Sequence, residues 1–298
     1  MRWLYHVLPR GTDLGERYAP PSVVIEGFVH CSFRDEVRES ALLYFPRDIG
    51  LEVLRIDPRR LDARVEVVGS PRGPMPHVHG PIPRDAVAAV LPLDRIDAEP
   101  DRVTGTHFGF VAFEGMTLLD LVGALDPISR IASMGFDPGA RTSLLSLASE
   151  RVWTCEGAAL SVDQIRPPLG GMDVLIVPGG LGTRALCEDP SVIEYLATFP
   201  PNRLLASVCT GSLLLGAAGR LTGRRATTHW TVMTELARYG ATPVDARLVD
   251  EGQLITAAGV SCALDLGMHL VRRFAGDEAA RKIATQMQLP STFVSGAP

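Results

Sequence analysis

One stretch limits the possible folds of this chain more than any other: an apolar run that turns directly into a helix at a cysteine. Residues 203–223 read RLLASVCTGSLLLGAAGRLTG. Leu204–Val208 has the length and composition of a buried strand, and Ser212–Leu221 has a helical pattern. A cysteine at the turn between them, Cys209, is held on a strained corner beside unpaired helix N–H groups, which favour its thiolate. The stretch predicts a nucleophile elbow with cysteine as the nucleophile.

Length and composition set the broad class. The chain has 298 residues, of which 46% are apolar and 21% charged, so it is long enough for two globular cores. The net charge of -5 gives no electrostatic reason to expect a nucleic-acid partner. No run approaches the ~20 apolar residues of a membrane span, so no membrane partner is expected. The five cysteines are scattered and the N-terminus lacks a signal-peptide pattern, which predicts a reducing, cytoplasmic location.

Residues 1–96 are expected to form a small α+β domain. Ser32 is expected to cap a helix over Arg34–Phe45, and residues 69–83 are too rich in proline and glycine for regular structure. Arg64–Val68 is expected to pair beside Leu51–Ile56. The predicted strands are Trp3–Leu8, Val23–Cys31, Leu51–Ile56, Arg64–Val68 and Ala86–Leu93. Residues 97–106 are polar and lack apolar periodicity, which predicts a linker to a second domain over residues 107–298.

Histidines concentrate in the first domain and raise the question of a metal site. His77 and His79 would share one face of an extended strand, as zinc ligands can. His30 and Cys31 would point to opposite faces, so both could not easily ligate one ion. The simpler interpretation is that hydrogen-bonded histidines tie a loop to a sheet. No metal and no cofactor is predicted.

The first domain also resembles a known family. The motifs EGFVHCS at Glu26–Ser32 and PHVHGPI at Pro76–Ile82, with the opening W-x-Y-H, resemble a small bacterial domain family of unknown function. That family is similar to the ADP-ribosyltransferase superfamily. The resemblance covers most of residues 1–96, and it implies a cleft for a nucleotide-like ligand. The residues that it would bring together there are His6, His30, Ser32 and His77.

From residue 107 the pattern alternates strands and helices, which is typical of a mainly parallel sheet covered on both faces. Ligand sites in such sheets lie beyond the carboxyl ends of the strands. Three predicted strand ends lead to candidate residues, and the sequence TTHW supplies a fourth candidate. These candidates are Asp120, Gly179 with Gly180, Cys209 and His229. Each also has a structural interpretation, as a helix cap, a tight turn or core packing, and only the position of Cys209 by itself favours chemistry.

Four stretches of the second domain resemble the PfpI-type members of the glutamine-amidotransferase-like superfamily. They are FGFVAFEGMTLLDLVG, DVLIVPGGLG, SVCTGSLLLGAAGRLTGRRATTHW and LITAAGVSCALDLGMHLV, and together they span roughly residues 107–289. Within the superfamily, isocyanide (isonitrile) hydratases and the ligand-binding domains of AraC-type regulators are the most similar. The resemblance implies a flavodoxin-like α/β sandwich that forms a homodimer.

The resemblance also implies residue roles. Cys209 falls on the nucleophile with Thr210 beside it, and Asp120 falls on an acid that is hydrogen-bonded to the sulfur. Gly179 and Gly180 match the glycine loop opposite the nucleophile, and His229 matches the histidine of the same motif and is expected to line the substrate pocket.

The implied reaction is hydration of a small-molecule isonitrile to an N-substituted formamide. Cys209 would attack the isonitrile carbon, and Asp120, with a raised pKa, would supply a proton and then direct water at the thioimidate intermediate. Thr210 is expected to orient Asp120 or the water, and backbone N–H groups near Gly180 and Thr210 are expected to stabilise developing charge.

Two alternatives stay open. One is another cysteine-dependent reaction of a glyoxalase, deglycase or amidase, and the other is a non-catalytic ligand or redox sensor. A DNA-binding regulator is disfavoured because little chain follows the second domain and the net charge is negative.

Overall fold

The computed structural model describes residues 1–290 and Phe293. The chain divides into two compact units, Met1–Val103 and Thr104–Pro298. No helix in the described part of the chain is long and apolar enough to cross a membrane. Each unit is described below by itself.

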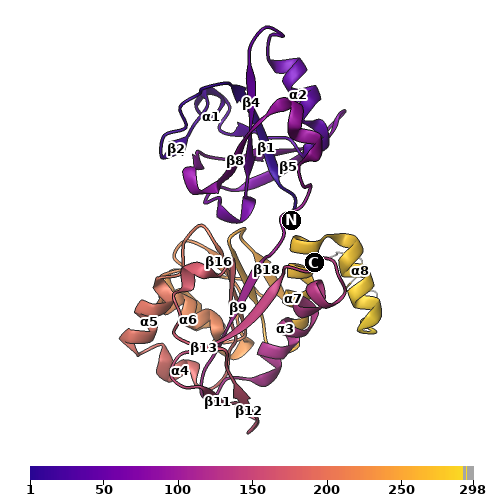
Figure 1. The fold of residues 1–298 in the computed structure, drawn as a ribbon. Coiled ribbons are helices and arrows are strands. Elements are labelled where there is room, and N and C mark those ends of the chain that lie inside the picture. The colour runs from indigo at the N-terminus through magenta and orange to yellow at the C-terminus, as the bar shows by residue number, and fades with distance from the viewer. Residues whose placement is uncertain (291–292, 294–298) are drawn as a thin grey trace. The chain divides into compact units, whose positions relative to one another are not determined.

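The first unit contains two three-stranded antiparallel sheets and a two-stranded pair (Figure 1). One sheet has the order β1 (Leu4–Pro9), β4 (Leu51–Ile56), β8 (Val87–Pro92), and the other has the order β3 (Val29–His30), β6 (Gly73–Val78), β5 (Val65–Ser70). The pair consists of β2 (Arg17–Tyr18) and β7 (Ile82–Pro83). The α-helices are α1 (Pro21–Ile25) and α2 (Val37–Tyr44), and the 3-10 helices are η1 (Arg34–Glu36), η2 (Pro58–Arg60), η3 (Arg84–Ala86) and η4 (Leu93–Ala98).

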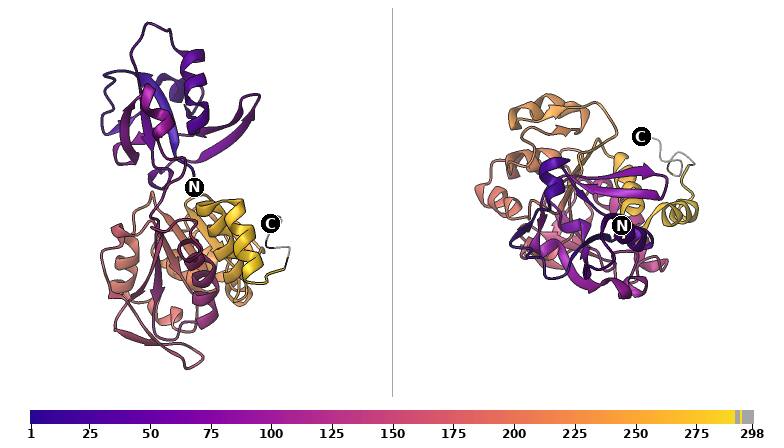
Figure 2. Two further views of the ribbon diagram at one scale, coloured as in Figure 1. Left: turned by 45° about the vertical axis from the view of Figure 1, so that its right-hand side comes forward. Right: turned by 90° about the horizontal axis from the view of Figure 1, so that it is seen from above.

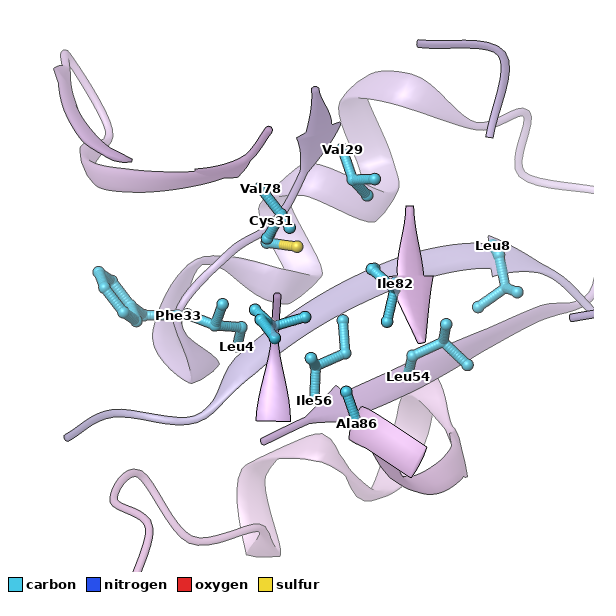
Figure 3. Packing of buried hydrophobic residues seen from close by; sticks show 11 residues of the cluster. Leu4, Leu8, Val29, Cys31, Phe33, Leu54, Ile56, Val78, Ile82 and Ala86 are labelled. Atoms are coloured by element: carbon cyan, nitrogen blue, oxygen red, sulfur yellow. The ribbon is translucent and has the colours of Figure 1, made fainter. Parts of the chain in front are cut away.

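The core of this unit lies between its sheets. Side chains from β1 and β4 meet Val29, Val78 and Ile82 from the other strands, and all three of these are fully buried (Figure 3). A second cluster of buried residues, including Tyr5 and Val37, joins β1 to α2. The unit therefore has a core of its own, as its length allows.

Several elements of the first unit differ from those predicted. The predicted strand Val23–Cys31 begins inside the short helix α1, continues as a turn, and is a strand only in β3, because Pro21 at the first helical position favours a helix start. Ser32 does not cap a helix, since its hydroxyl hydrogen-bonds to that of Ser40 at 2.9 Å. The predicted helix begins instead as η1 and becomes α-helical at Val37.

The proline-rich segment over residues 69–83 was expected to be irregular, but it contains β6 and β7. β5 pairs with β6 and not with β4, so the predicted pairing of Arg64–Val68 beside Leu51–Ile56 is wrong. Pairing with a strand on each side keeps β6 extended despite Pro74 and Pro76, and such long-range pairing is invisible to local propensity.

Most of the segment expected to be a linker, residues 97–106, is attached to the first unit. The Tyr5 hydroxyl donates to the Pro100 carbonyl at 2.6 Å, and the Trp3 N–H donates to the Asp101 carbonyl at 3.0 Å. The Val103 N–H donates to the Met1 carbonyl at 3.0 Å. The chain therefore leaves the first unit after Val103.

The second unit is built on one seven-stranded sheet, which is parallel except for one edge strand. Its order is β13 (Gln164–Ile165), β10 (Arg141–Ser146), β9 (His107–Ala112), β14 (Val174–Val177), β15 (Leu204–Val208), β19 (Leu254–Ala257) and the antiparallel β18 (Leu248–Asp250). Outside this sheet lie η5 (Leu169–Gly171) and two small pairs, β11 (Arg151–Trp153) with β12 (Ala159–Ser161), and β16 (Arg225–Ala226) with β17 (Thr242–Pro243).

Helices cover both faces of the large sheet (Figures 1 and 2). On one face α3 (Leu118–Ser133) packs against α7 (Cys262–Ala275), with α8 (Asp277–Gln286) beside them. On the other face lie α4 (Thr183–Leu186), α5 (Pro190–Ala197), α6 (Gly211–Ala217) and η6 (Trp230–Tyr239). This arrangement confirms the predicted fold class, a small α+β unit followed by a flavodoxin-like α/β sandwich. The helix α6 ends earlier than predicted because Gly219 adopts a left-handed conformation with φ of 74°.

Candidate active site

The cysteine elbow forms at the carboxyl end of β15. Cys209 has a φ of 56°, a left-handed conformation that strains any residue other than glycine. Its N–H donates to the carbonyls of Ala257 and Ala258, each at 3.0 Å, and its side chain is almost fully buried. The strained strand-to-helix corner is the one that the sequence predicted. The two hydrogen bonds from the end of β19 hold it in place.

Asp120 brings a carboxyl group to the same end of the sheet. It lies in the first turn of α3 and is fully buried. Its Oδ2 accepts a hydrogen bond from the Gly179 N–H at 3.0 Å. Its Oδ1 is buried and accepts no hydrogen bond of regular geometry from the described residues, and the Cys209 thiol interacts with the carboxyl as a weak donor. Burial raises the pKa of Asp120 to about 7, although both of these donors act against that increase.

The protonation state of Cys209 differs from the expected thiolate. Burial, together with the neighbouring charge of Asp120, raises the pKa of the Cys209 thiol to about 12, although donors from Thr210 act against that increase. Of the two groups, the Asp120 carboxyl therefore loses its proton first, and Cys209 rests as a thiol at neutral pH.

Thr210 holds the glycine loop that follows β14. Its Oγ1 accepts from the Gly180 N–H at 2.9 Å and donates to the Gly180 carbonyl at 3.2 Å, and the Thr183 hydroxyl donates to it at 3.1 Å. Its side chain makes no hydrogen bond to Asp120 among the described residues, so the expected orientation of Asp120 is not seen, and orientation of the water by Thr210 stays a prediction. The Gly180 N–H, expected to stabilise developing charge, is already bonded to Thr210.

The two glycines pack tightly against their surroundings. A methyl group added to Gly179 would lie 2.6 Å from the Thr210 nitrogen and 2.8 Å from the Cys209 Cβ. A methyl group on Gly180, whose φ is 136°, would lie 2.4 Å from the Gly115 carbonyl. The loop can approach the elbow this closely only because these residues lack side chains.

His229 stands apart from the cysteine and the carboxyl. It precedes η6, and its Nδ1 accepts from the Thr231 hydroxyl at 2.7 Å and from the Thr231 N–H at 3.4 Å. In the described part of the chain it makes no hydrogen bond to Cys209, so the structure shows no cysteine–histidine pair.

A cavity of about 420 Å³ opens beside the elbow. Its walls include Thr228, whose hydroxyl donates to the Cys209 carbonyl at 3.0 Å, and Leu119, which precedes Asp120 in α3. Cys209 and Asp120 are not among the residues that line it. The cavity is lined by Leu119, Thr228, His229, Trp230, Met233, Asp245, Ala258, Gly259, Val260 and Ser261.

One residue that the sequence did not single out also affects the site. Glu156 lies between β11 and β12, accepts from the Leu118 N–H at 3.1 Å, and raises the pKa of Asp120 through its charge. Its place in the sequence carries no motif, and only the folded hairpin brings it to the start of α3.

In the first unit, the structure separates the four candidate residues into two environments. His30 lies directly opposite His77 in the β3–β6 pair, and their ring centroids are 5.2 Å apart. His6 is buried, with its Nδ1 donating to the His30 carbonyl at 2.7 Å, and burial lowers its pKa to about 4. Ser32 is buried as well. No three histidine, cysteine or acidic residues of the described chain are placed to hold a metal ion.

Family models match both units. The model for the DJ-1/PfpI family matches residues 109–273, which includes the elbow and Asp120. The model for a family described as a protein of unknown function, DUF952, matches residues 12–90.

Similar proteins include enzymes and regulators. An isonitrile hydratase from Pseudomonas putida is 33% identical over 195 residues, which cover 64% of this chain and 83% of that protein. The transcriptional regulator GbdR of Pseudomonas aeruginosa is 27% identical over 188 residues, 62% of this chain and only 51% of the regulator. A glutathione-independent glyoxalase from Caenorhabditis elegans is 30% identical over 112 residues, 37% of this chain and 60% of that protein.

Solved structures show the same fold. A THiJ/PfpI family protein from Pseudomonas syringae matches with a TM-score of 0.55 and 30% identity, over 66% of this chain and 78% of the other. DJ-1beta of Drosophila melanogaster matches with a TM-score of 0.55 and 21% identity, over 63% of this chain and 100% of the other.

Proposed function

Because the chain belongs to the DJ-1/PfpI family, we propose that its second unit is a cysteine-dependent isonitrile hydratase. The observation that carries the proposal is the contact between the Cys209 thiol and a fully buried carboxyl, Asp120, whose pKa is raised to about 7. A group with this pKa can exchange protons in both directions at neutral pH. Isonitrile hydration requires that exchange, because a proton must reach the carbon that the sulfur attacks.

In the first step, Asp120 takes the proton of the Cys209 thiol, and the thiolate attacks the terminal carbon of the isonitrile. Asp120 then returns the proton to that carbon. An S–H bond is broken, a C–S and a C–H bond form, and the product is a thioimidate that links Cys209 to the substrate.

In the second step, Asp120 accepts a proton from a water molecule as the water oxygen attacks the same carbon. The nitrogen takes the second proton of the water, from the hydroxyl that the attack leaves on the carbon, and the C–S bond breaks as the C=O bond forms. The proton held by Asp120 then restores the Cys209 thiol. The released product is an N-substituted formamide. The cavity beside the elbow would hold the substituent of the isonitrile, with His229 as part of its wall.

Turnover with an isonitrile tests this proposal. The protein should form the N-substituted formamide, Cys209→Ala should abolish the reaction, and Asp120→Asn should slow it by about 100-fold to 10,000-fold, the usual contribution of a proton-transferring group. Cys187→Ala is the matched control, because this cysteine lies in the same unit outside the elbow and should leave activity unchanged. Formamide production that survives Cys209→Ala would rule the scheme out.

The similar proteins also suggest a competing function for the same site. The similar proteins include a glyoxalase and transcriptional regulators, so a screen with α-oxoaldehydes should run beside the isonitriles. Turnover of an oxoaldehyde at Cys209 without isonitrile hydration would assign the same elbow to glyoxalase chemistry.

A further inference from the structure

A group of aromatic rings lies on the outer face of the small sheet β3-β6-β5 in the first unit. We call it the ring cluster, and it consists of Phe28, His30, Tyr44, His77 and His79. We propose that the ring cluster and Arg72 form a binding site for a small ligand that joins a flat heteroaromatic ring to an anionic group, the chemistry of a mononucleotide.

The strand register explains why the rings face away from the core. Val29 and Val78 are paired across β3 and β6, and both point into the core (Figure 3). Their neighbours His30 and His77 are also paired, and successive side chains of a strand point to opposite faces, so both imidazoles lie on the outer face. The core of the unit therefore does not require these rings.

The rings offer surfaces for stacking. Phe28 stacks on His77 with centroids 4.0 Å apart and planes at 13°. The ring of Tyr44, from the end of α2, is nearly parallel to that of His30, but the centroids are 6.3 Å apart. Tyr44 is 61% exposed, so a small movement of its ring would admit a flat group against His30. Stacking of bases on aromatic side chains is a common source of affinity in nucleic-acid binding proteins.

His77 leaves hydrogen-bonding capacity at the centre of the cluster. His30 and His79 each use Nε2 to contact a carboxylate, Glu26 at 3.0 Å and Glu66 at 3.1 Å. His77 makes no hydrogen bond within the described chain, and burial together with the two neighbouring imidazoles lowers its pKa. A neutral imidazole has one donor and one acceptor, which suits the edge of a heteroaromatic ring.

Arg72 supplies the place for an anion. Its guanidinium donates to the Ser40 hydroxyl at 3.3 Å and to the Tyr44 hydroxyl at 3.2 Å, and it makes no ion pair with a described carboxylate. The carboxyl of Glu36 lies near the adjacent Gly73 without pairing with Arg72. A guanidinium held by neutral hydroxyls beside an aromatic ring keeps donors free for a phosphate or carboxylate. The carboxylates Glu26 and Glu66 contact histidines of the cluster, so the anionic end of the ligand belongs at Arg72.

Calorimetric titration of the full chain with adenosine monophosphate, adenosine and inorganic phosphate tests the site. The monophosphate should bind at least tenfold more tightly than either fragment, because only it engages both the rings and Arg72. Absence of binding at millimolar adenosine monophosphate, or equal affinity for one of the fragments, would overturn the proposal.

Variants separate the two parts of the site. Arg72→Gln should weaken monophosphate binding at least tenfold, to the level of adenosine, whereas Arg95→Gln, an exposed arginine of the same unit, should not change it. Tyr44→Leu should also weaken binding several-fold, while Tyr44→Phe keeps the ring and should retain most of it. Equal affinity in all four variants would contradict the assignment. Cys209→Ala should bind the ligand normally, so this result stands apart from the hydratase proposal.

Discussion

Cys209 and Asp120 both have raised pKa values, about 7 for the carboxyl and about 12 for the thiol, so the carboxyl still loses its proton first. Above pH 7 the pair holds one proton, and below pH 7 it holds two. The proposed attack needs a thiolate together with a protonated carboxyl, which is a rearranged form of the one-proton pair. The two-proton pair has no nucleophile.

The pH dependence of the reaction follows from this count of protons. We expect kcat/KM for an isonitrile to rise about tenfold per pH unit below about pH 7 and to level off above it, because kcat/KM reports the ionisation of the free enzyme. Formamide formation between pH 5 and 9 measures this. A flat profile, or a rate that falls as the pH rises through 7, would be inconsistent with the proposed pair.

The buried carboxyl should also lower stability at high pH. The ordinary pKa of Asp120 is 3.8, and the folded value is about 7, so between these values the folded state retains a proton that the unfolded chain has lost. The free energy of unfolding therefore falls as the pH rises from about 4 to 7. Asp120→Asn, which cannot ionise, should be more stable than the wild type by about 2–4 kcal/mol at pH 8.

Urea unfolding of the two proteins at several pH values measures this difference. The advantage of Asp120→Asn should shrink steadily toward pH 4, where the wild-type carboxyl is protonated in both states. A variant that is less stable than the wild type at pH 8 would show that the ionised carboxyl is stabilised by its neighbours.

At the residue scale the sequence predicted the turn but not the state of its sulfur. The apolar run before Cys209 and the small residues after it indicate the strand-to-helix turn, and the φ of 56° confirms the strained corner. The thiol pKa depends on burial and on the charge of Asp120, which arise only from packing across three strands. The hydrogen bonds of Thr210 to Gly180 depend on the same packing.

At the scale of elements, the site depends on three loops at the carboxyl ends of β9, β14 and β15. The Thr117 N–H donates to the Gly179 carbonyl at 2.8 Å, and the Gly179 N–H donates to the Asp120 carboxyl. Gly179 therefore connects the loop after β14 to the loop after β9. Its lack of a side chain lets it lie against the elbow. Displacement of this loop would move the carboxyl that we propose as the proton carrier.

A methyl group at Gly179 should disturb the fold and the site together. Gly179→Ala should destabilise the protein by about 1–3 kcal/mol, as overpacked sites do, and lower turnover by about 100-fold, because the loop must move away from Cys209. Gly170→Ala is the control, since a methyl group there meets nothing within 4 Å. Thermal unfolding and formamide assays compare the two, and a fully active Gly179→Ala would disprove the need for close approach.

Strands that are buried on both faces and a helix with one long apolar face were the easiest to predict. The bounds of β14, β15 and α3 match the apolar patterns of the sequence, because burial fixes their composition. In the first unit, β6 contains two prolines and its extended form depends on partners distant in sequence. Local propensity therefore predicted a loop where the fold has a strand.

At the scale of the whole molecule, the chain carries two units, each with buried apolar residues of its own. The residues proposed for isonitrile hydration all lie in the second unit, and those of the ring cluster all lie in the first. A unit with its own core can fold independently. A chain reduced to residues 104–298 should therefore fold and retain formamide production within about twofold of the full chain. Loss of folding or of activity on removal of residues 1–103 would show that the first unit completes the second.

The central claim, a covalent bond between Cys209 and the isonitrile carbon, can be observed directly by mass spectrometry. Acid quenching during turnover, or of Asp120→Asn, in which hydrolysis is slowed, should trap a protein heavier by the mass of one isonitrile. Peptide mapping should place the added mass on Cys209, and Cys209→Ala should show none. Formamide produced with no adduct at Cys209 under any quench condition would contradict the account.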